Sequence, residues 1–125
     1  MTAKRPLVTV VDDDESVRES LPDLLKELGF ANRAFSSAEA FLASDEVEQS
    51  QCLILDIAMP GMTGPELQLE LIRRGVHLPI VFITAQLDES VRSAVVARGA
   101  VACLFKPFTE VALLEAINAA LGITS

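Results

Sequence analysis

Five short apolar runs, separated by amphipathic segments, constrain the fold of this 125-residue chain more than any other feature. The runs cover residues 7–11, 31–35, 52–55, 80–83 and 101–105. Most of them are β-branched or bulky at successive positions, which is typical of strands covered by helices on both faces. Asn32 and Arg33 interrupt the second run. We therefore expect that run to form an edge strand.

The segments between the runs carry the start and stop signals of helices. Ser36 and Glu39 have the spacing of a capping box, which predicts a short helix through Leu42. Gly64-Pro65 predicts the start of another helix, and Asp88 and Thr109 are candidate N-caps of two more. Glycines suited to the residue after a helix end complete the four longer helices: Gly29, Gly75, Gly99 and Gly122.

Five strand–helix units in succession predict one α/β domain with a parallel sheet and helices on both faces. Connections between parallel strands are right-handed, so the chain winds across the sheet in both directions. In such a doubly wound fold, binding sites form beyond the carboxyl ends of the strands. The residues directly after each apolar run are therefore the candidates for function.

Composition excludes several classes of protein. Half of the residues are hydrophobic, which excludes an intrinsically disordered chain. The 10 Lys and Arg against 18 Asp and Glu give a net charge of −8, which argues against electrostatic binding of nucleic acid. No apolar run is long enough to cross a bilayer. Cys52 and Cys103 lie in apolar runs and do not form a CxxC pair, so we expect small buried thiols in a soluble, cytoplasmic protein.

Polar and charged residues follow four of the five runs. Asp12 and Asp13 follow the first run, Asp56 the third, Thr84 the fourth and Lys106 the fifth. Clustered carboxylates repel one another unless a cation lies among them, and oxygen ligands suit Mg²⁺ or Mn²⁺. Zinc is disfavoured, because the chain has a single histidine.

Each of these residues also has an ordinary structural explanation. An acidic triplet before a helix is often only a cap that complements the helix dipole, and Thr84 or Lys106 alone would mean little. Asp56 differs, because a charge that ends an unbroken apolar run is costly without a partner. These ordinary structural roles give no reason for all four strand ends to carry such groups in this order.

In combination, these residues resemble the receiver domains of bacterial two-component response regulators, especially the nitrogen-fixation and nodulation type. The likeness covers residues 7–121, within a single domain of residues 1–125. Its motifs are Val10-Val11-Asp12-Asp13-Asp14, Leu55-Asp56-Ile-Ala-Met-Pro60-Gly-Met-Thr-Gly64, Phe82-Ile-Thr84-Ala85 and Phe105-Lys106-Pro107-Phe108. The resemblance implies a flavodoxin-like, three-layer sandwich with strand order 2-1-3-4-5.

The same resemblance implies a role for each strand-end residue. Asp56 would accept a phosphoryl group from a sensor histidine kinase. Thr84 and Lys106 would bind the phosphoryl oxygens, with a cis peptide between Lys106 and Pro107. Mg²⁺ would be held by the carboxylates and one backbone carbonyl: Asp12, Asp13, Asp56 and the carbonyl of Ala58.

The implied function is a phosphorylation-activated switch rather than an enzyme, since the only catalysis would be its own phosphorylation and dephosphorylation. It would control transcription through an output domain absent from this chain, which alone would bind DNA. A stand-alone receiver or phosphate shuttle remains the alternative. Phosphorylation would promote a homodimer through the fourth helix, which Asp88 begins and Gly99 ends, and the fifth strand. Val91, Val95 and Ala102 are candidate contacts where they are not core.

Three positions depart from or tune the family pattern. Receivers commonly carry an aromatic switch residue three positions before the lysine, where this chain has Cys103. Phe105, next to Lys106, could serve instead, but adjacent strand positions do not generally share a face. Ala58 and Gln86 occupy the positions that tune phosphoryl lifetime in the family; Gln86 can orient an attacking water, whereas Ala58 cannot.

Other classes fit less well. A phosphatase of the haloacid-dehalogenase type needs a second acid two residues after its aspartyl nucleophile, and that position is Ala58. In a flavodoxin-like electron carrier the acidic triplet would repel the flavin phosphate, and the chain has no Trp or Tyr to stack on the flavin. A metal-free interaction module remains open and differs in its response to magnesium.

Overall fold

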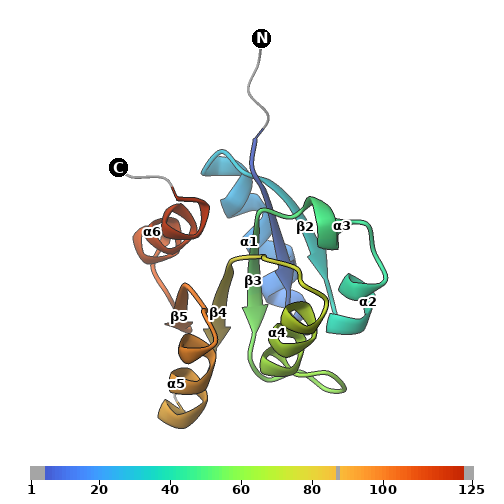
Figure 1. The fold of residues 1–125 in the computed structure, drawn as a ribbon. Coiled ribbons are helices and arrows are strands. Elements are labelled where there is room, and N and C mark those ends of the chain that lie inside the picture. Colours follow the sequence, from blue (N-terminus) through green and yellow to red (C-terminus); the bar gives the residue numbers. More distant parts are fainter. Residues whose placement is uncertain (1–4, 87, 123–125) are drawn as a thin grey trace.

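The computed structural model describes residues 5–86 and 88–122 and shows one five-stranded parallel sheet in the order β2-β1-β3-β4-β5 (Figure 1). The predicted α/β class and strand order are thus confirmed. The strands coincide with the five apolar runs to within one residue: β1 (Leu7–Val11), β2 (Ala31–Phe35), β3 (Cys52–Asp56), β4 (Ile80–Thr84) and β5 (Ala102–Phe105). β2 pairs only with β1 and is partly exposed, as its interrupted run predicted.

The helices lie between the strands in sequence: α1 (Glu15–Glu27), α2 (Ala38–Leu42), α3 (Glu46–Gln49), α4 (Gly64–Arg73), α5 (Glu89–Ala97) and α6 (Glu110–Leu121). The predicted caps at Asp88 and Thr109 are confirmed, because both side chains accept backbone N–H bonds of the first turn. The predicted start of α4 at Gly64-Pro65 is confirmed too. Thr63 and Glu66 add a capping box there that the sequence reading missed.

One sequence prediction about the second helical segment was wrong, and one short helix after it was not predicted. The capping box at Ser36 and Glu39 does not form: Ser37 is the N-cap of α2, and its hydroxyl accepts from the Ala40 N–H. Glu39 turns instead to the loop after β3, where its carboxylate accepts the Met62 N–H at 3.2 Å. The four-residue helix α3 was also not predicted, because it is too short to show a helical period.

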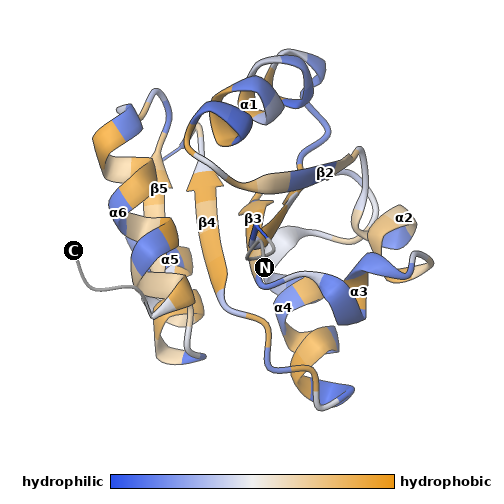
Figure 2. Ribbon diagram, turned by 90° about the horizontal axis from the view of Figure 1, so that it is seen from above, coloured by the Kyte–Doolittle hydropathy of each residue, from blue (hydrophilic) through white to orange (hydrophobic). Residues whose placement is uncertain are grey.

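The core consists of two hydrophobic clusters, one on each face of the sheet. Alternate residues of β3 and β4 point to opposite faces, so Ile54 and Ile83 pack with α1 and α6, whereas Leu55 and Phe82 pack with α2, α4 and α5. In Figure 2 these two strands are apolar along their length, while the helices alternate apolar and polar residues. This explains why the runs are continuously apolar.

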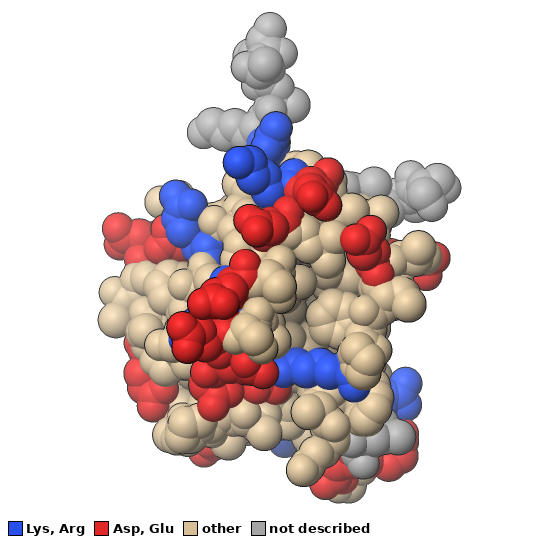
Figure 3. Space-filling view, turned by 180° about the vertical axis from the view of Figure 1, so that it is seen from behind, with Lys and Arg blue, Asp and Glu red and all other residues tan. Residues whose placement is uncertain are grey.

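Helix α1 presents an acidic stripe to solvent. Four exposed acids recur every four residues along it: Glu15, Glu19, Asp23 and Glu27. Figure 3 shows acidic side chains in a band across this side of the molecule. A negative surface of this kind repels the phosphate backbone of nucleic acid.

Both cysteines are free thiols in apolar surroundings, as predicted. Cys52 is fully buried and Cys103 is partly buried against the cluster that contains Phe82. Burial raises the pKa of the Cys52 thiol to about 12. Among the described residues, no helix has the length and apolar character that a membrane span requires.

Candidate functional site

The carboxyl ends of β1 and β3 bring three carboxylates together. Asp12 and Asp13 directly follow β1, and Asp56 is the last residue of β3. One oxygen from each of the three lies within 4.8 Å of the others. The grouping predicted from the sequence is therefore present, because β1 and β3 are neighbours in the sheet.

Asp12 is the most constrained of the three acids. Its side chain is fully buried; Oδ1 accepts the Asp14 N–H at 2.9 Å, and Oδ2 accepts from Lys106 Nζ at 2.9 Å. Its backbone carbonyl accepts from Arg18 Nη1 at 3.0 Å. Asp14, by contrast, is the exposed N-cap of α1, so the structural explanation holds for that member of the triplet. We did not predict the Arg18 contact from the sequence, although a basic residue one turn into the helix could have indicated it.

Asp56 lies in an environment that opposes its ionisation. The residue is 6% exposed, and burial raises its pKa to about 7, with a further rise from the charge of Asp12. Lys106 opposes this rise, but its Nζ is 3.8 Å from Asp56 Oδ1 and is bonded to Asp12 instead. One ammonium thus faces three carboxylates, and the cluster attracts a further cation.

The donor set suits a small, hard cation. Carboxylate oxygens predominate, and oxygen ligands favour Mg²⁺ or Mn²⁺ over softer metals. Asp13 and Asp56 open onto a cavity whose wall also includes Ala58, the residue expected to offer a backbone carbonyl. The cavity joins residues from four strand ends: Asp13, Asp14, Asp56, Ala58, Thr84, Ala85, Gln86 and Lys106.

Thr84 lines this cavity, but its hydroxyl is bonded within its own loop. Oγ1 donates to the Gln86 carbonyl at 2.7 Å and accepts the Gln86 N–H at 3.1 Å. For the hydroxyl to donate to a new anion on Asp56, it must leave the Gln86 carbonyl. Such a bond would therefore disturb the loop after β4.

Lys106 reaches the cavity from the end of β5. Its backbone N–H donates to the Thr84 carbonyl at 2.8 Å, and the peptide bond to Pro107 is cis, as the resemblance implied. Cys103 and Phe105 are two positions apart on β5 and therefore share a face, so face assignment does not separate them as candidates for a switch residue. Exposure does separate them, because Cys103 packs against the core and Phe105 is 50% exposed.

The loop that follows Asp56 is held close to the strand end by a glycine. The Gly64 N–H donates to the Ile57 carbonyl at 3.0 Å, and a Cβ on Gly64 would lie 2.2 Å from the Asp56 carbonyl oxygen. On the opposite side, the Glu39 carboxylate holds the Met62 N–H. Neither positioning role was predicted from the sequence; Gly64-Pro65 was interpreted only as a helix start.

Comparison with known proteins agrees with this geometry. The family described as response regulator receiver domain matches residues 8–118. Nodulation protein W of Bradyrhizobium diazoefficiens is 40% identical over 116 residues, covering 93% of this chain and 51% of that protein. The transcriptional regulatory protein TdiR of Thauera aromatica is 40% identical over 122 residues, covering 98% of this chain and 54% of that protein. The chain thus spans about half the length of these curated relatives.

Solved structures show the same arrangement. The response regulator StyR superposes with a TM-score of 0.87 at 47% identity, over 94% of this chain and 60% of that one. The structure titled FixJ-N superposes with a TM-score of 0.85 at 36% identity, over 100% of this chain and 98% of that one.

Proposed function

This chain belongs to the family of response regulator receiver domains, the phosphorylation-dependent signalling switches of two-component systems, and on that premise we propose that Asp56 is its phosphoacceptor. One observation carries the assignment. Asp56 is the buried carboxylate at the centre of the strand-end cluster, in reach of Asp12, Asp13 and Lys106. The Asp12 carboxylate is already hydrogen-bonded to Lys106, and the Asp13 carboxylate is exposed to solvent. Neither is therefore both buried in the cluster and free to react.

In the proposed reaction, a carboxylate oxygen of Asp56 forms a bond to the phosphorus while the bond from phosphorus to the donor nitrogen of the kinase histidine breaks. Bound Mg²⁺, held by Asp12, Asp13, Asp56 and the Ala58 carbonyl, would supply positive charge that offsets the repulsion between carboxylate and phosphoryl group. Burial makes ionised Asp56 costly, and the Lys106 ammonium lowers that cost. The arriving phosphoryl group attracts Lys106 away from its pairing with Asp12.

The proposed conformational response starts at Thr84. Its hydroxyl exchanges the Gln86 carbonyl for a phosphoryl oxygen, which moves the loop that leads into α5. A local change in charge thereby biases an element with two arrangements. The catalysis in this proposal is confined to phosphorylation and dephosphorylation of the chain itself.

Intact-mass spectrometry tests the phosphoacceptor. With acetyl phosphate or phosphoramidate and Mg²⁺, the wild-type chain should gain one phosphoryl group, and Asp56→Asn should gain none. Asp23→Asn removes an exposed carboxylate from α1 and serves as the charge-matched control, which should be labelled like wild type. Full labelling of Asp56→Asn would show that another residue accepts the group.

For partners, we propose a sensor histidine kinase as the donor, acting in the cytoplasm, with residues 1–125 as a single receiver domain. Relatives about twice as long are described as transcriptional regulators, which supports an output in transcription through a separate DNA-binding domain. The alternative is a stand-alone receiver that acts by protein–protein contact or as a phosphate shuttle. Phosphotransfer profiling against candidate kinases identifies the donor.

A phosphorylation-dependent homodimer through α5 and β5 is supported by the surface there. Within residues 5–86 and 88–122, β5 pairs only with β4, so no described strand covers its other edge. Exposed apolar residues lie on these elements and beside them: Val96, Val101 and Phe105. Val95, an earlier candidate contact, is fully buried core, and Val91 and Ala102 are only partly exposed. The contact surface is therefore centred on Phe105 rather than on Val95.

A further inference from the structure

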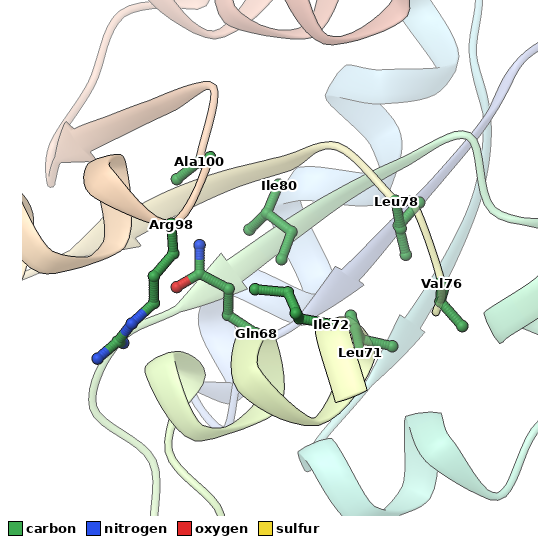
Figure 4. A pocket seen from close by; sticks show the side chains of 9 residues that line it. Gln68, Leu71, Ile72, Val76, Leu78, Ile80, Arg98 and Ala100 are labelled. Carbon is green, nitrogen blue, oxygen red and sulfur yellow. The ribbon is translucent and has the colours of Figure 1, made fainter. Parts of the chain in front are cut away.

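A second cavity lies between α4 and α5, lined by residues remote from the strand ends that carry the acids. Its walls are formed by apolar side chains of α4, of the segment before β4 and of the turn that ends α5, among them Leu71, Ile72, Leu78 and Ala100. In Figure 4 the amide of Gln68 lies between Arg98 on one side and Ile72 and Ile80 on the other, with Leu71 and Leu78 farther away. The cavity has a volume of about 50 Å³.

Gln68 is a buried polar side chain that lines this cavity, and one of its two polar atoms has no hydrogen-bond partner among the described residues. The residue is 2% exposed, and its Nε2 donates to the Val95 carbonyl at 3.0 Å. Its Oε1 is buried and accepts no hydrogen bond from the described residues. A buried amide oxygen without a donor is costly, so this atom favours a ligand that brings an O–H or N–H group.

The mouth of the cavity carries a cation. Arg98 lines the cavity and is exposed, and among the ion pairs of residues 5–86 and 88–122 none involves it. In Figure 4 its side chain runs beside the Gln68 amide and extends outward. A ligand that donates to Gln68 could therefore place an anionic group near Arg98.

We propose that this cavity binds a short hydroxy acid, with its hydroxyl on Gln68 Oε1, its carbons against Leu71 and Ile72, and its carboxylate near Arg98. Size supports this class of ligand. At about 10–15 Å³ for each water-sized atom, the cavity holds roughly three to five non-hydrogen atoms. That is a hydroxyl with two or three carbons, the carboxylate remaining at the mouth.

Three probes with the same three-carbon skeleton test the proposal on the unphosphorylated chain, independently of Asp56. Lactate carries both groups, propionate lacks the hydroxyl, and 2-propanol lacks the carboxylate. In ¹⁵N-resolved NMR titrations at constant ionic strength, lactate should give saturable shifts of the Gln68 side-chain amide and of Gly99 and Ala100, with a Kd of about 1–10 mM. Propionate and 2-propanol should each bind at least about fivefold more weakly than lactate.

Two variants complete the test. Gln68→Met keeps the length of the side chain and removes the acceptor, so it should lose the preference for lactate over propionate. Arg98→Gln changes an exposed residue and should weaken the binding of lactate while leaving the binding of 2-propanol unchanged. If lactate and propionate shift the same signals with equal affinity, the hydroxyl makes no contact with Gln68 and the proposal is wrong. If lactate gives no saturable shift at these residues, the cavity binds no hydroxy acid and the proposal is wrong as well. The Arg98→Gln comparison decides the matter even if Gln68→Met fails to fold.

Discussion

Lys106 is hydrogen-bonded to Asp12 at 2.9 Å and lies 3.8 Å from Asp56, so burial and the charge of Asp12 outweigh its effect on the pKa of Asp56. That pKa of about 7 lies well above the ordinary value of 3.8. The unfolded chain therefore releases this proton at lower pH than the folded chain does, and folding becomes less favourable as the pH rises from 3.8 to about 7. Above about pH 7 the destabilisation caused by ionising Asp56 has reached its full size.

Asp56→Asn should therefore stabilise the metal-free protein, and the gain should depend on pH. We expect little difference from wild type near pH 4 and an increase in the free energy of unfolding of about 1–3 kcal/mol at pH 8. Urea denaturation at the two pH values measures it. An equal gain at both would mean that relief of charge at Asp56 is not the cause.

Asp13 is exposed and bonded less tightly than Asp12, so its removal should change metal binding without harming the fold. For Asp13→Asn we expect at least about tenfold weaker Mg²⁺ binding, together with equal or greater stability of the metal-free form. Isothermal titration and thermal denaturation measure the two effects. Asp14→Asn is the control, because asparagine is also a good N-cap and the change removes the same charge next door. Equal Mg²⁺ affinity in wild type and Asp13→Asn would contradict a ligand role.

Sequence reasoning found the strand-end residues because their positions depend on local order alone. Asp12, Asp56 and Thr84 each follow an apolar run, and parallel strands bring such ends together. The bonding partners were not predictable in the same way. Lys106 pairs with Asp12 from 94 residues away, and Glu39 reaches Met62 across 23 residues. Such contacts depend on tertiary packing, which the local periodicity of the sequence does not predict.

At the level of elements, α4 begins unusually close to the end of β3. The Cβ of an alanine at position 64 would lie 2.2 Å from the Asp56 carbonyl oxygen, so Gly64→Ala must push the helix and the strand end apart. We expect a cost of about 1–3 kcal/mol in unfolding free energy and weaker Mg²⁺ binding, because the loop with Ala58 moves.

Gly75→Ala is the matched comparison for this effect. A Cβ there meets nothing within 4 Å, but the residue has φ +72°, so alanine costs about 1–2 kcal/mol in backbone strain alone. Chemical denaturation should show both variants destabilised, whereas Mg²⁺ titration should show a change only in Gly64→Ala. Unchanged Mg²⁺ affinity in Gly64→Ala would show that the position of the helix start does not affect the metal site.

Element boundaries show where local signals compete. The caps at Asp88 and Thr109 were predictable because each precedes a long amphipathic segment. Between Phe35 and Ala38 two serines compete for the same role, and Ser37 caps α2 because Glu39 is drawn to Met62. A capping box needs both of its side chains, and here a tertiary contact takes one of them.

For the molecule as a whole, the exposed Phe105 on the open side of β5 is the test of the proposed dimer. Beryllofluoride, a stable mimic of the aspartyl phosphate, should shift the wild-type chain toward dimer in sedimentation experiments. Phe105→Ser should weaken that dimer by at least about tenfold, since a central aromatic contact carries much of an interface's free energy. Leu69→Ser removes a comparably exposed apolar residue from α4 and should have no effect. A wild-type chain that stays monomeric with beryllofluoride would rule out this interface.

The sheet divides the interior into two clusters that share no residue, with Leu67 and Leu71 on one side and Leu113 and Ile117 on the other. A change of side-chain volume on one side need be compensated only by neighbours on that side. A lineage that carries this fold can therefore repack the half under α4 and α5, and with it the surface that meets a new partner, while the half under α1 and α6 stays as it was. The two halves of the domain are free to evolve at different rates around one shared backbone.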